Sequence, residues 1–466
     1  MCAQKKYRMD MCHGSLFSQI FRFSLPLMGT TVMSLMFLAA DMVVLGQFAA
    51  PEVRIAATAA VGATSALNTL LLIFFSGFSA GVNSITARYI GAKDDNRVSK
   101  TVHTSIALGI YGGIFFTLLG VFGARTALVW MGTPPDVIGK ATIYLQIYSA
   151  GLPFLVLYMI GSAVLRAMGD TQRPLLYITI AGIVNVLLNL LFVIVFKMDA
   201  AGVALATKLS NLVSGGLVLR ALCHSDGPVR LVFKKIQFHW DNLKEVLWIG
   251  IPAGIQGSLY TFANIFIQSS VNTLGSAAMA GNAACQSLEG VANVASNAYY
   301  QTAMSFTGQN LGGKKYKRVV RSIWICLLYS AVFSIIAGAL FLTFGRTLLG
   351  LYNPEPTVIN WGMERLVIMM STYFLCGLMD AISGALRGLG HSVKPTITTI
   401  AGACGLRILW VLMVFPHFRT LQSLMICYPV SWILTGGING IILFFVCRNL
   451  LFKARDTGAG YLHLKR

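Results

Sequence analysis

Long apolar runs alternate with short polar connections along almost the whole chain of 466 residues. A helix needs about 20 mostly apolar residues to cross a bilayer core of about 30 Å. Twelve runs meet this length, and their even number predicts that both ends of the chain lie on one side of a membrane. The runs cover residues 20–46, 57–84, 98–123, 137–162, 174–196, 201–222, 246–272, 278–306, 319–344, 358–385, 395–416 and 420–447.

Composition agrees with a protein whose main solvent is lipid. Hydrophobic residues make up 56% of the chain and charged residues 11%, whereas about a quarter of an ordinary soluble domain is charged. The mean hydropathy is +0.70. We therefore expect an all-α integral membrane protein with the lipid bilayer as its surroundings.

The net charge of +20 raises the question of nucleic-acid binding. The basic residues occur in short clusters between apolar runs, a pattern that orients membrane proteins, so no nucleic-acid partner is expected. The nine cysteines contain no CxxC pair, and the seven histidines form no cluster with metal-ligand spacing. No structural metal and no bound cofactor are expected.

The distribution of Lys and Arg predicts the orientation. Of the 36 basic residues, 27 fall on the side of the termini and 7, Arg365 among them, on the opposite side. The remaining two, Lys208 and Arg407, lie inside apolar runs. Because cytoplasmic loops carry the excess of basic residues, both termini are predicted to be cytoplasmic in a multi-pass protein of the cell membrane.

The longest polar interruption divides the chain into two halves. It contains Asp226-Gly227-Pro228 and a pair of lysines, a composition typical of a linker. The predicted organisation is a cytoplasmic tail at 1–19, an N-terminal six-helix lobe at 20–222, a cytoplasmic linker at 223–242, a C-terminal six-helix lobe at 243–447 and a cytoplasmic tail at 448–466.

An internal repeat supports this division. The segment 162–174, with its Leu-Arg-x-x-Gly, recurs at 383–395, and Gly91, Lys93, Arg97 and Val98 recur at positions 312, 314, 318 and 319, both at an offset of 221. Because each half has an even number of runs, the two repeats enter the membrane from the same side and are parallel. Parallel repeats are a transporter arrangement, with the substrate cavity between the lobes.

Several motifs in this order and spacing resemble the multidrug and toxic compound extrusion (MATE) family. They are Pro26 with Asp41 and Gly46, the segment 88–93, both Leu-Arg-x-x-Gly repeats, Asn185-Val-Leu-Leu-Asn189, the segment 202–207 and the segment 306–312. The resemblance implies a V-shaped pair of six-helix lobes and secondary active antiport with no enzymatic activity. Small organic cations would leave the cell in exchange for H⁺ or Na⁺, and we expect a monomer.

The resemblance also implies an ion-coupling site in the N-terminal lobe. Matched position by position, its residues are Asp41, Asn185, Asn189 and Thr207. The family pattern has a second carboxylate where this chain has Asn189. A transported proton would therefore depend on Asp41 alone, and protonation and cation binding would compete for that carboxylate.

Two further acids lie inside apolar runs of the C-terminal lobe, where buried charges are costly and often functional. Glu289 and Asp380 are candidates for ion or substrate binding, together with Arg407. The structural alternative is that one of the acids pairs with Arg407. Lys208, next to Thr207, either keeps Asp41 ionised or extends toward the membrane interface.

A group of aromatic and methionine side chains is the candidate lining of a cavity for flat cations, through stacking and cation–π contact. Its members are Met36, Phe37, Tyr260, Phe262, Phe266, Tyr299 and Tyr300. Lipid-facing and core positions are the alternative for each one alone.

Three other functions are alternatives to efflux. A flippase for lipid-linked precursors, with the same broad fold, should have a cationic cavity and often extra helices. An intramembrane hydrolase would need a nucleophile with a base, or a metal motif. A receptor or scaffold gives no reason for a parallel repeat with buried acids.

Overall fold

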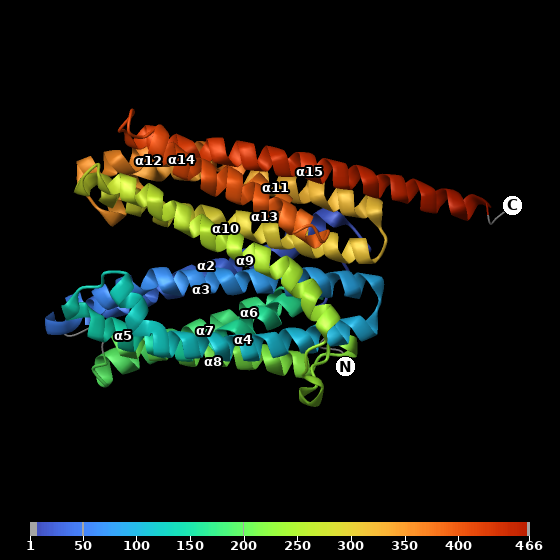
Figure 1. Cartoon of the computed structure of the whole chain (residues 1–466), viewed down its shortest axis with the longest axis horizontal. Coiled ribbons are helices and arrows are strands. Elements are labelled where there is room, and N and C mark those ends of the chain that lie inside the picture. The colour runs from blue at the N-terminus through green and yellow to red at the C-terminus, as the bar shows by residue number, and fades with distance from the viewer. Residues whose placement is uncertain (1–6, 49–50, 199, 464–466) are drawn as a thin grey trace. The chain divides into compact units, whose positions relative to one another are not determined.

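The computed structural model describes residues 7–48, 51–198 and 200–463, and this part of the chain contains helices but no strand. Figure 1 shows the helices as a bundle of long rods within each half of the chain. In chain order they are α2 (Leu16–Phe48), α3 (Pro51–Ala92), α4 (Asp95–Trp130), α5 (Pro135–Ala150), α6 (Leu152–Ala167), α7 (Gln172–Leu190), α8 (Ala200–Cys223), α9 (Trp240–Asn272), α10 (Ser276–Gly312), α11 (Tyr316–Tyr352), α12 (Pro356–Gly388), α13 (Val393–Thr399), α14 (Leu406–Met413) and α15 (Leu421–His463).

Each of the twelve predicted runs falls on helix. Ten helices of the described residues are long and apolar enough to cross a membrane, or eleven when α5 and α6, bent by 42°, count as one span. The run at 278–306 corresponds to α10, which has 37 residues but is more polar than the other spans. A π-helical turn, Leu191–Val195, continues α7, and another, Ile400–Gly405, joins α13 to α14.

The chain forms two compact units. Unit 1 comprises Gly29–Ile90 and Asp94–Leu247 with a short N-terminal piece that ends at Met9. Unit 2 comprises Asp10–Met28, Gly91–Lys93 and the chain from Trp248 onward. The first part of α2 therefore belongs to the same unit as the second half of the sequence.

The repeated sequence motifs form helix C-termini. Gly169 and Gly390, which follow α6 and α12, have φ of +90° and +88°. Their backbone N–H groups donate to the carbonyls of Arg166 and Arg387, both at 2.9 Å. Glycine adopts this left-handed conformation without a Cβ clash, so each Leu-Arg-x-x-Gly closes the helix that precedes it.

The Gly-x-Lys motifs have the same role after α3 and α10. Lys93 and Lys314 have φ of +57° and +55°, which is uncommon for residues other than glycine. The N–H of the residue after each lysine donates back to the helix, from Asp94 to Tyr89 at 3.1 Å and from Lys315 to Asn310 at 2.8 Å. The repeat therefore duplicates the places where four helices end.

Helices α10 and α12 approach each other closely enough for backbone to meet backbone. A Cβ on Gly281 would lie 2.6 Å from both the Gly362 nitrogen and the Val358 oxygen. Toward the other end of the pair, a Cβ on Gly384 would collide with the Tyr300 carbonyl. Small residues allow this close approach, which contributes van der Waals packing where lipid supplies no hydrophobic driving force.

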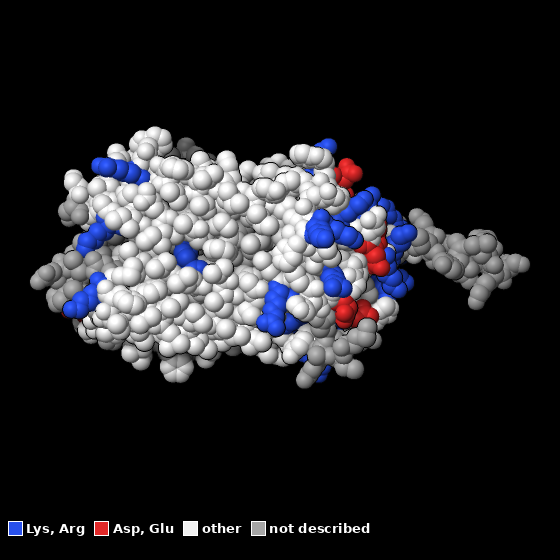
Figure 2. All heavy atoms as spheres, turned by 90° about the horizontal axis from the view of Figure 1, so that it is seen from below, with Lys and Arg blue, Asp and Glu red and all other residues white. Residues whose placement is uncertain are grey.

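The surface matches a membrane-embedded protein. On the face shown in Figure 2, most Lys and Arg side chains lie toward the two ends, the Asp and Glu side chains lie at one end, and the middle is almost entirely uncharged. Large apolar side chains stand exposed on the helices, among them Phe122, Trp130 and Phe444. Such a surface would be unfavourable in water and is stable in hydrocarbon.

Candidate functional site

Four side chains predicted to form an ion site meet in unit 1. Asp41 lies on α2, Asn185 and Asn189 lie one turn apart on α7, and Thr207 lies on α8. The Asn189 amide nitrogen donates to Asp41 Oδ1 and, at 3.2 Å, to Asn185 Oδ1. The Thr207 hydroxyl lies 3.3 Å from Asp41 Oδ2 and accepts from the Asn185 amide at 3.3 Å. The structure thus gathers the other three residues around the Asp41 carboxylate.

The Thr207 hydroxyl limits how this cluster can share its protons. It lies 2.8 Å from the Val203 carbonyl oxygen and 3.3 Å from Asp41 Oδ2, but it has one proton to donate. When that proton goes to Val203, the hydroxyl oxygen can accept a proton from a neutral Asp41 carboxyl group. The cluster therefore accommodates both the ionised and the protonated acid.

In unit 2 the acid Glu289, with a side chain 13% exposed, is paired with Arg365. The guanidinium donates to both carboxylate oxygens, at 2.6 and 2.7 Å, and to Asn282 Oδ1 at 2.6 Å. Arg365 is 2% exposed within α12, so its assignment to the connections opposite the termini was wrong. Hydropathy treats a lone Arg as a polar interruption and does not reveal a partner on another helix.

Arg407 lies without a carboxylate partner among the described residues. Its guanidinium donates to Ser431, Asn264 and Tyr260, at 3.1, 3.3 and 2.9 Å. The rings of Tyr260 and Tyr428 lie 4.5 and 4.3 Å from the guanidinium carbon. The expected alternative, a pair between Arg407 and Glu289 or Asp380, does not occur, because neutral acceptors and aromatic faces enclose the guanidinium.

Asp380 forms no ion pair with any residue that the structure describes. The Cys376 thiol lies 4.0 Å from its Oδ2. Of the three candidate acids, Asp41 is held by neutral donors, Glu289 by a guanidinium and Asp380 by a thiol. The two units thus treat their acids differently.

The predicted cavity-lining residues have different environments. Met36 is 55% exposed on unit 1, and Phe37 covers Gly182. In unit 2, Phe262 and Phe266 form an edge-to-face pair at 5.3 Å and are partly exposed. The other three lie in contact networks of unit 2, with Tyr260 on Arg407, Tyr299 stacked on Tyr329 at 5.8 Å and Tyr300 bound by Arg387.

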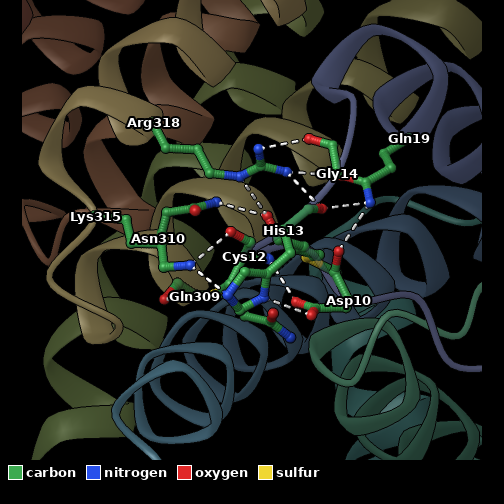
Figure 3. A network of polar contacts seen from close by, with 10 residues as sticks. Asp10, Cys12, His13, Gly14, Gln19, Gln309, Asn310, Lys315 and Arg318 are labelled. Carbon is green, nitrogen blue, oxygen red and sulfur yellow. Dashed lines mark hydrogen bonds and ion pairs between the residues drawn. The ribbon is translucent and has the colours of Figure 1, made fainter.

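A polar network at the helix ends of unit 2 was not anticipated from the sequence. Figure 3 shows the N-terminal segment Asp10–Gly14 held by α10 and α11. Arg318 donates to the carbonyls of Met11, His13 and Gly14 and to Gln19, and Lys315 donates to the Cys12 carbonyl at 3.0 Å. The basic cluster at 314–321 predicted orientation alone. Its backbone-directed bonds carry no sequence signal.

Two titrating groups of this segment are shifted by their surroundings. For Asp10, burial acts to raise the pKa, but hydrogen bonds from the His13 side chain and the Cys12 backbone outweigh it and hold the pKa below its usual value. Burial raises the pKa of the Cys12 thiol. No group of three or more His, Cys, Asp or Glu side chains within the described residues could hold a metal ion.

Comparison with known proteins gives a consistent result. A model of the protein family described as MatE matches residues 26–191 and 252–413, more than half of the chain. A probable multidrug resistance protein of Bacillus subtilis, YpnP, is 28% identical over 396 residues, covering 84% of this chain and 86% of the relative. An FAD transporter of Shewanella oneidensis is 24% identical, covering 87% and 90%.

A solved structure resembles the fold over nearly the whole chain. It shows the outward-facing conformation of a multidrug resistance MATE family transporter of the MOP superfamily. The TM-score is 0.87, with 20% sequence identity and coverage of 94% of this chain and 98% of the other. The expected arrangement of helices in two repeated halves is confirmed by this similarity.

Proposed function

Because the chain belongs to the MatE family, whose members are transporters and not enzymes, we propose that it exports organic cations by antiport against an inward ion. The observation that supports this proposal is the cluster of Asp41, Asn185, Asn189 and Thr207, which surrounds one acid with neutral donors. It acts as a monomer in the cell membrane with both termini in the cytoplasm.

Coupling follows from competition at Asp41. A proton or Na⁺ entering from outside neutralises the carboxylate, and its release inside leaves the ionised acid free for the next cycle. One charge moving through 100 mV contributes about 2.3 kcal/mol, which supports roughly a 50-fold gradient of a neutral substrate. Exchange of one cation for one cation uses only the chemical gradient.

A second substrate class is favoured by Arg407. A buried guanidinium that has no carboxylate partner among the described residues supplies positive charge to unit 2. The relative named FAD transporter suggests that this fold can also carry an anionic compound.

Transport by the purified protein in liposomes tests the function. The liposomes contain a cationic dye, with pH and Na⁺ gradients imposed separately, and FAD replaces the dye in a parallel series. We expect dye transport driven by one of the two gradients. Dye movement driven by neither would contradict antiport of cations, and FAD transport alone would favour the second class.

The variant Asp41→Asn tests the role of the carboxylate. It keeps the size of the side chain and removes the group that titrates, so ion-driven dye transport should fall to background. Asp95→Asn is the matched control, because Asp95 is an exposed acid of the same unit. Unimpaired gradient-driven transport by Asp41→Asn at equal protein content would remove Asp41 from the mechanism.

A further inference from the structure

Lys208 is a buried cation that the coupling scheme above does not use. Its side chain is 6% exposed, on α8 directly after Thr207. The ammonium nitrogen lies 3.1 Å from the centre of the Tyr148 ring on α5 and has no hydrogen-bond acceptor among the described residues. A cation over an aromatic face is stabilised by the ring, but all three N–H donors of Lys208 remain unused.

The fold makes room for this side chain. Helices α5 and α6 break at Gly151 with a bend of 42°. A Cβ at Gly151 would collide with Cβ, Cγ and Cδ of Lys208. The break between α5 and α6 therefore accommodates the aliphatic part of Lys208, whose ammonium lies over the Tyr148 ring.

Lys208 and Asp41 belong to one site in unit 1. Thr207, whose hydroxyl contacts Asp41, is the residue before Lys208 on α8. Tyr148 lies in an apolar cluster with Val44, one turn after Asp41, and Val203, one turn before Thr207. Around Lys208 the charged or titratable groups of the described residues are Asp41 on α2 and Tyr144 and Tyr148 on α5, while α7 presents neutral amides.

We propose that Lys208 is the tethered cation of the Asp41 site and makes this site selective for H⁺ over Na⁺, an inference that rests on the proposed coupling at Asp41. When Asp41 is ionised, the ammonium moves from Tyr148 to the carboxylate. When Asp41 takes up a proton from solution, the neutral acid no longer holds the ammonium, which returns to Tyr148.

The selectivity has a simple physical origin. A sodium ion at Asp41 would have to displace the Lys208 ammonium. This ammonium is tethered to α8 directly after Thr207 and is therefore present at high effective concentration. The sodium ion would also remain close to that cation in a medium of low dielectric constant, where like charges repel strongly. A proton must also overcome the attraction between the carboxylate and the ammonium, but it binds covalently and leaves no net charge on the carboxyl group to repel the ammonium.

Sodium binding by the purified full-length protein in detergent tests the proposal without requiring transport. The thermal unfolding midpoint is measured in NaCl and in choline chloride at equal ionic strength. The wild-type midpoint should be the same in both salts. The unfolding midpoint of Lys208→Gln should rise with Na⁺ concentration. Half of this rise should occur at a Na⁺ concentration at least tenfold lower than that needed for any response of the wild type.

Three further variants make the result specific. Lys208→Arg keeps a tethered cation, so its unfolding midpoint should remain insensitive to Na⁺. A merely structural role of Lys208 would not require this insensitivity. Asp41→Asn combined with Lys208→Gln should lose the gained response. Lys197→Gln replaces an exposed lysine of the same unit and should behave as the wild type.

Two results would overturn the proposal. One is Na⁺ stabilisation of the wild type that Asp41→Asn abolishes. The other is a folded Lys208→Gln or Lys208→Met protein that shows no Na⁺ response. Because these measurements report ion binding, failure of dye transport in liposomes would count against the proposed function and not against the tethered cation.

Discussion

Glu289 and Arg365 place opposite charges in the interior of unit 2, 2.6 Å apart at their closest atoms. A buried pair of this kind contributes modest net stability, but loss of one partner leaves an uncompensated charge away from water. The pair also fixes α10 against α12, because Arg365 reaches Asn282 on α10 as well. Removal of one partner should therefore reduce the stability of the protein more than removal of both.

Glu289→Gln should destabilise the protein more than the double variant Glu289→Gln with Arg365→Met. The single change strands the guanidinium at a cost of about 3–5 kcal/mol, whereas the double change removes both charges. Thermal unfolding of the purified protein in detergent measures the difference, and the four proteins form a double-mutant cycle.

The control for this cycle is Glu364→Gln, at the neighbouring position of α12. Glu364 forms no ion pair within the described part of the chain, so its loss should leave the unfolding midpoint nearly unchanged. If the double variant were less stable than both single variants, the argument from a stranded charge would fail.

At the scale of helices, the contact of α10 with α12 depends on glycines that have no space for a Cβ, unlike some other helical glycines. Gly384 faces the Tyr300 carbonyl with no room for a methyl group, whereas Gly437 on α15 has no atom within 4 Å of an added Cβ. Both lie inside helices, where alanine is intrinsically favoured by about 1 kcal/mol. The two glycines therefore differ only in the space available for an added methyl group.

Gly384→Ala and Gly437→Ala should therefore change stability in opposite directions. The first forces α12 away from α10, and overpacking of this kind typically costs about 1–3 kcal/mol. The second gains helix propensity with no collision and should be neutral or slightly stabilising. Unfolding midpoints in detergent decide the matter, and an unchanged or raised midpoint for Gly384→Ala would contradict the close backbone contact.

At the scale of the whole molecule, the parallel repeat and the bias of basic residues together predict the side on which each end lies. A fluorescent protein that folds only in the cytoplasm should fluoresce when fused to either terminus. The same protein fused to a chain truncated after Thr133, between α4 and α5, should stay dark. Fluorescence from one terminus only would require an odd number of crossings.

Much of the fold could be predicted because its signals are local. Apolar runs fix where helices lie, and the offset of 221 between glycines fixes where they end, since a left-handed C-terminal residue is a property of a few adjacent positions. The gathering of Asp41 with Asn185, Asn189 and Thr207 followed from the family resemblance and not from periodicity.

The remainder could not be predicted because it depends on distant partners. Pro153, two residues after Gly151, is a local signal for the break between α5 and α6. The contact of Gly151 with the stem of Lys208, 57 positions later, has no such local signal. Arg365 has its partner 76 residues away in the sequence. Hydropathy describes each side chain by itself and does not detect pairs of residues that are distant in the sequence.

The attachment of Asp10–Gly14 to α10 and α11 has a consequence for biosynthesis. Its hydrogen bonds join residues 299 to 307 positions apart, so the segment leaves the ribosome long before its partners exist. At about 5–20 residues per second, that interval is roughly 15–60 s. Until α10 and α11 exist, Gln19 of the same N-terminal piece can bind the Asp10 and His13 carbonyls. Attachment to α10 and α11 then joins the beginning of the chain to a helix pair made hundreds of residues later.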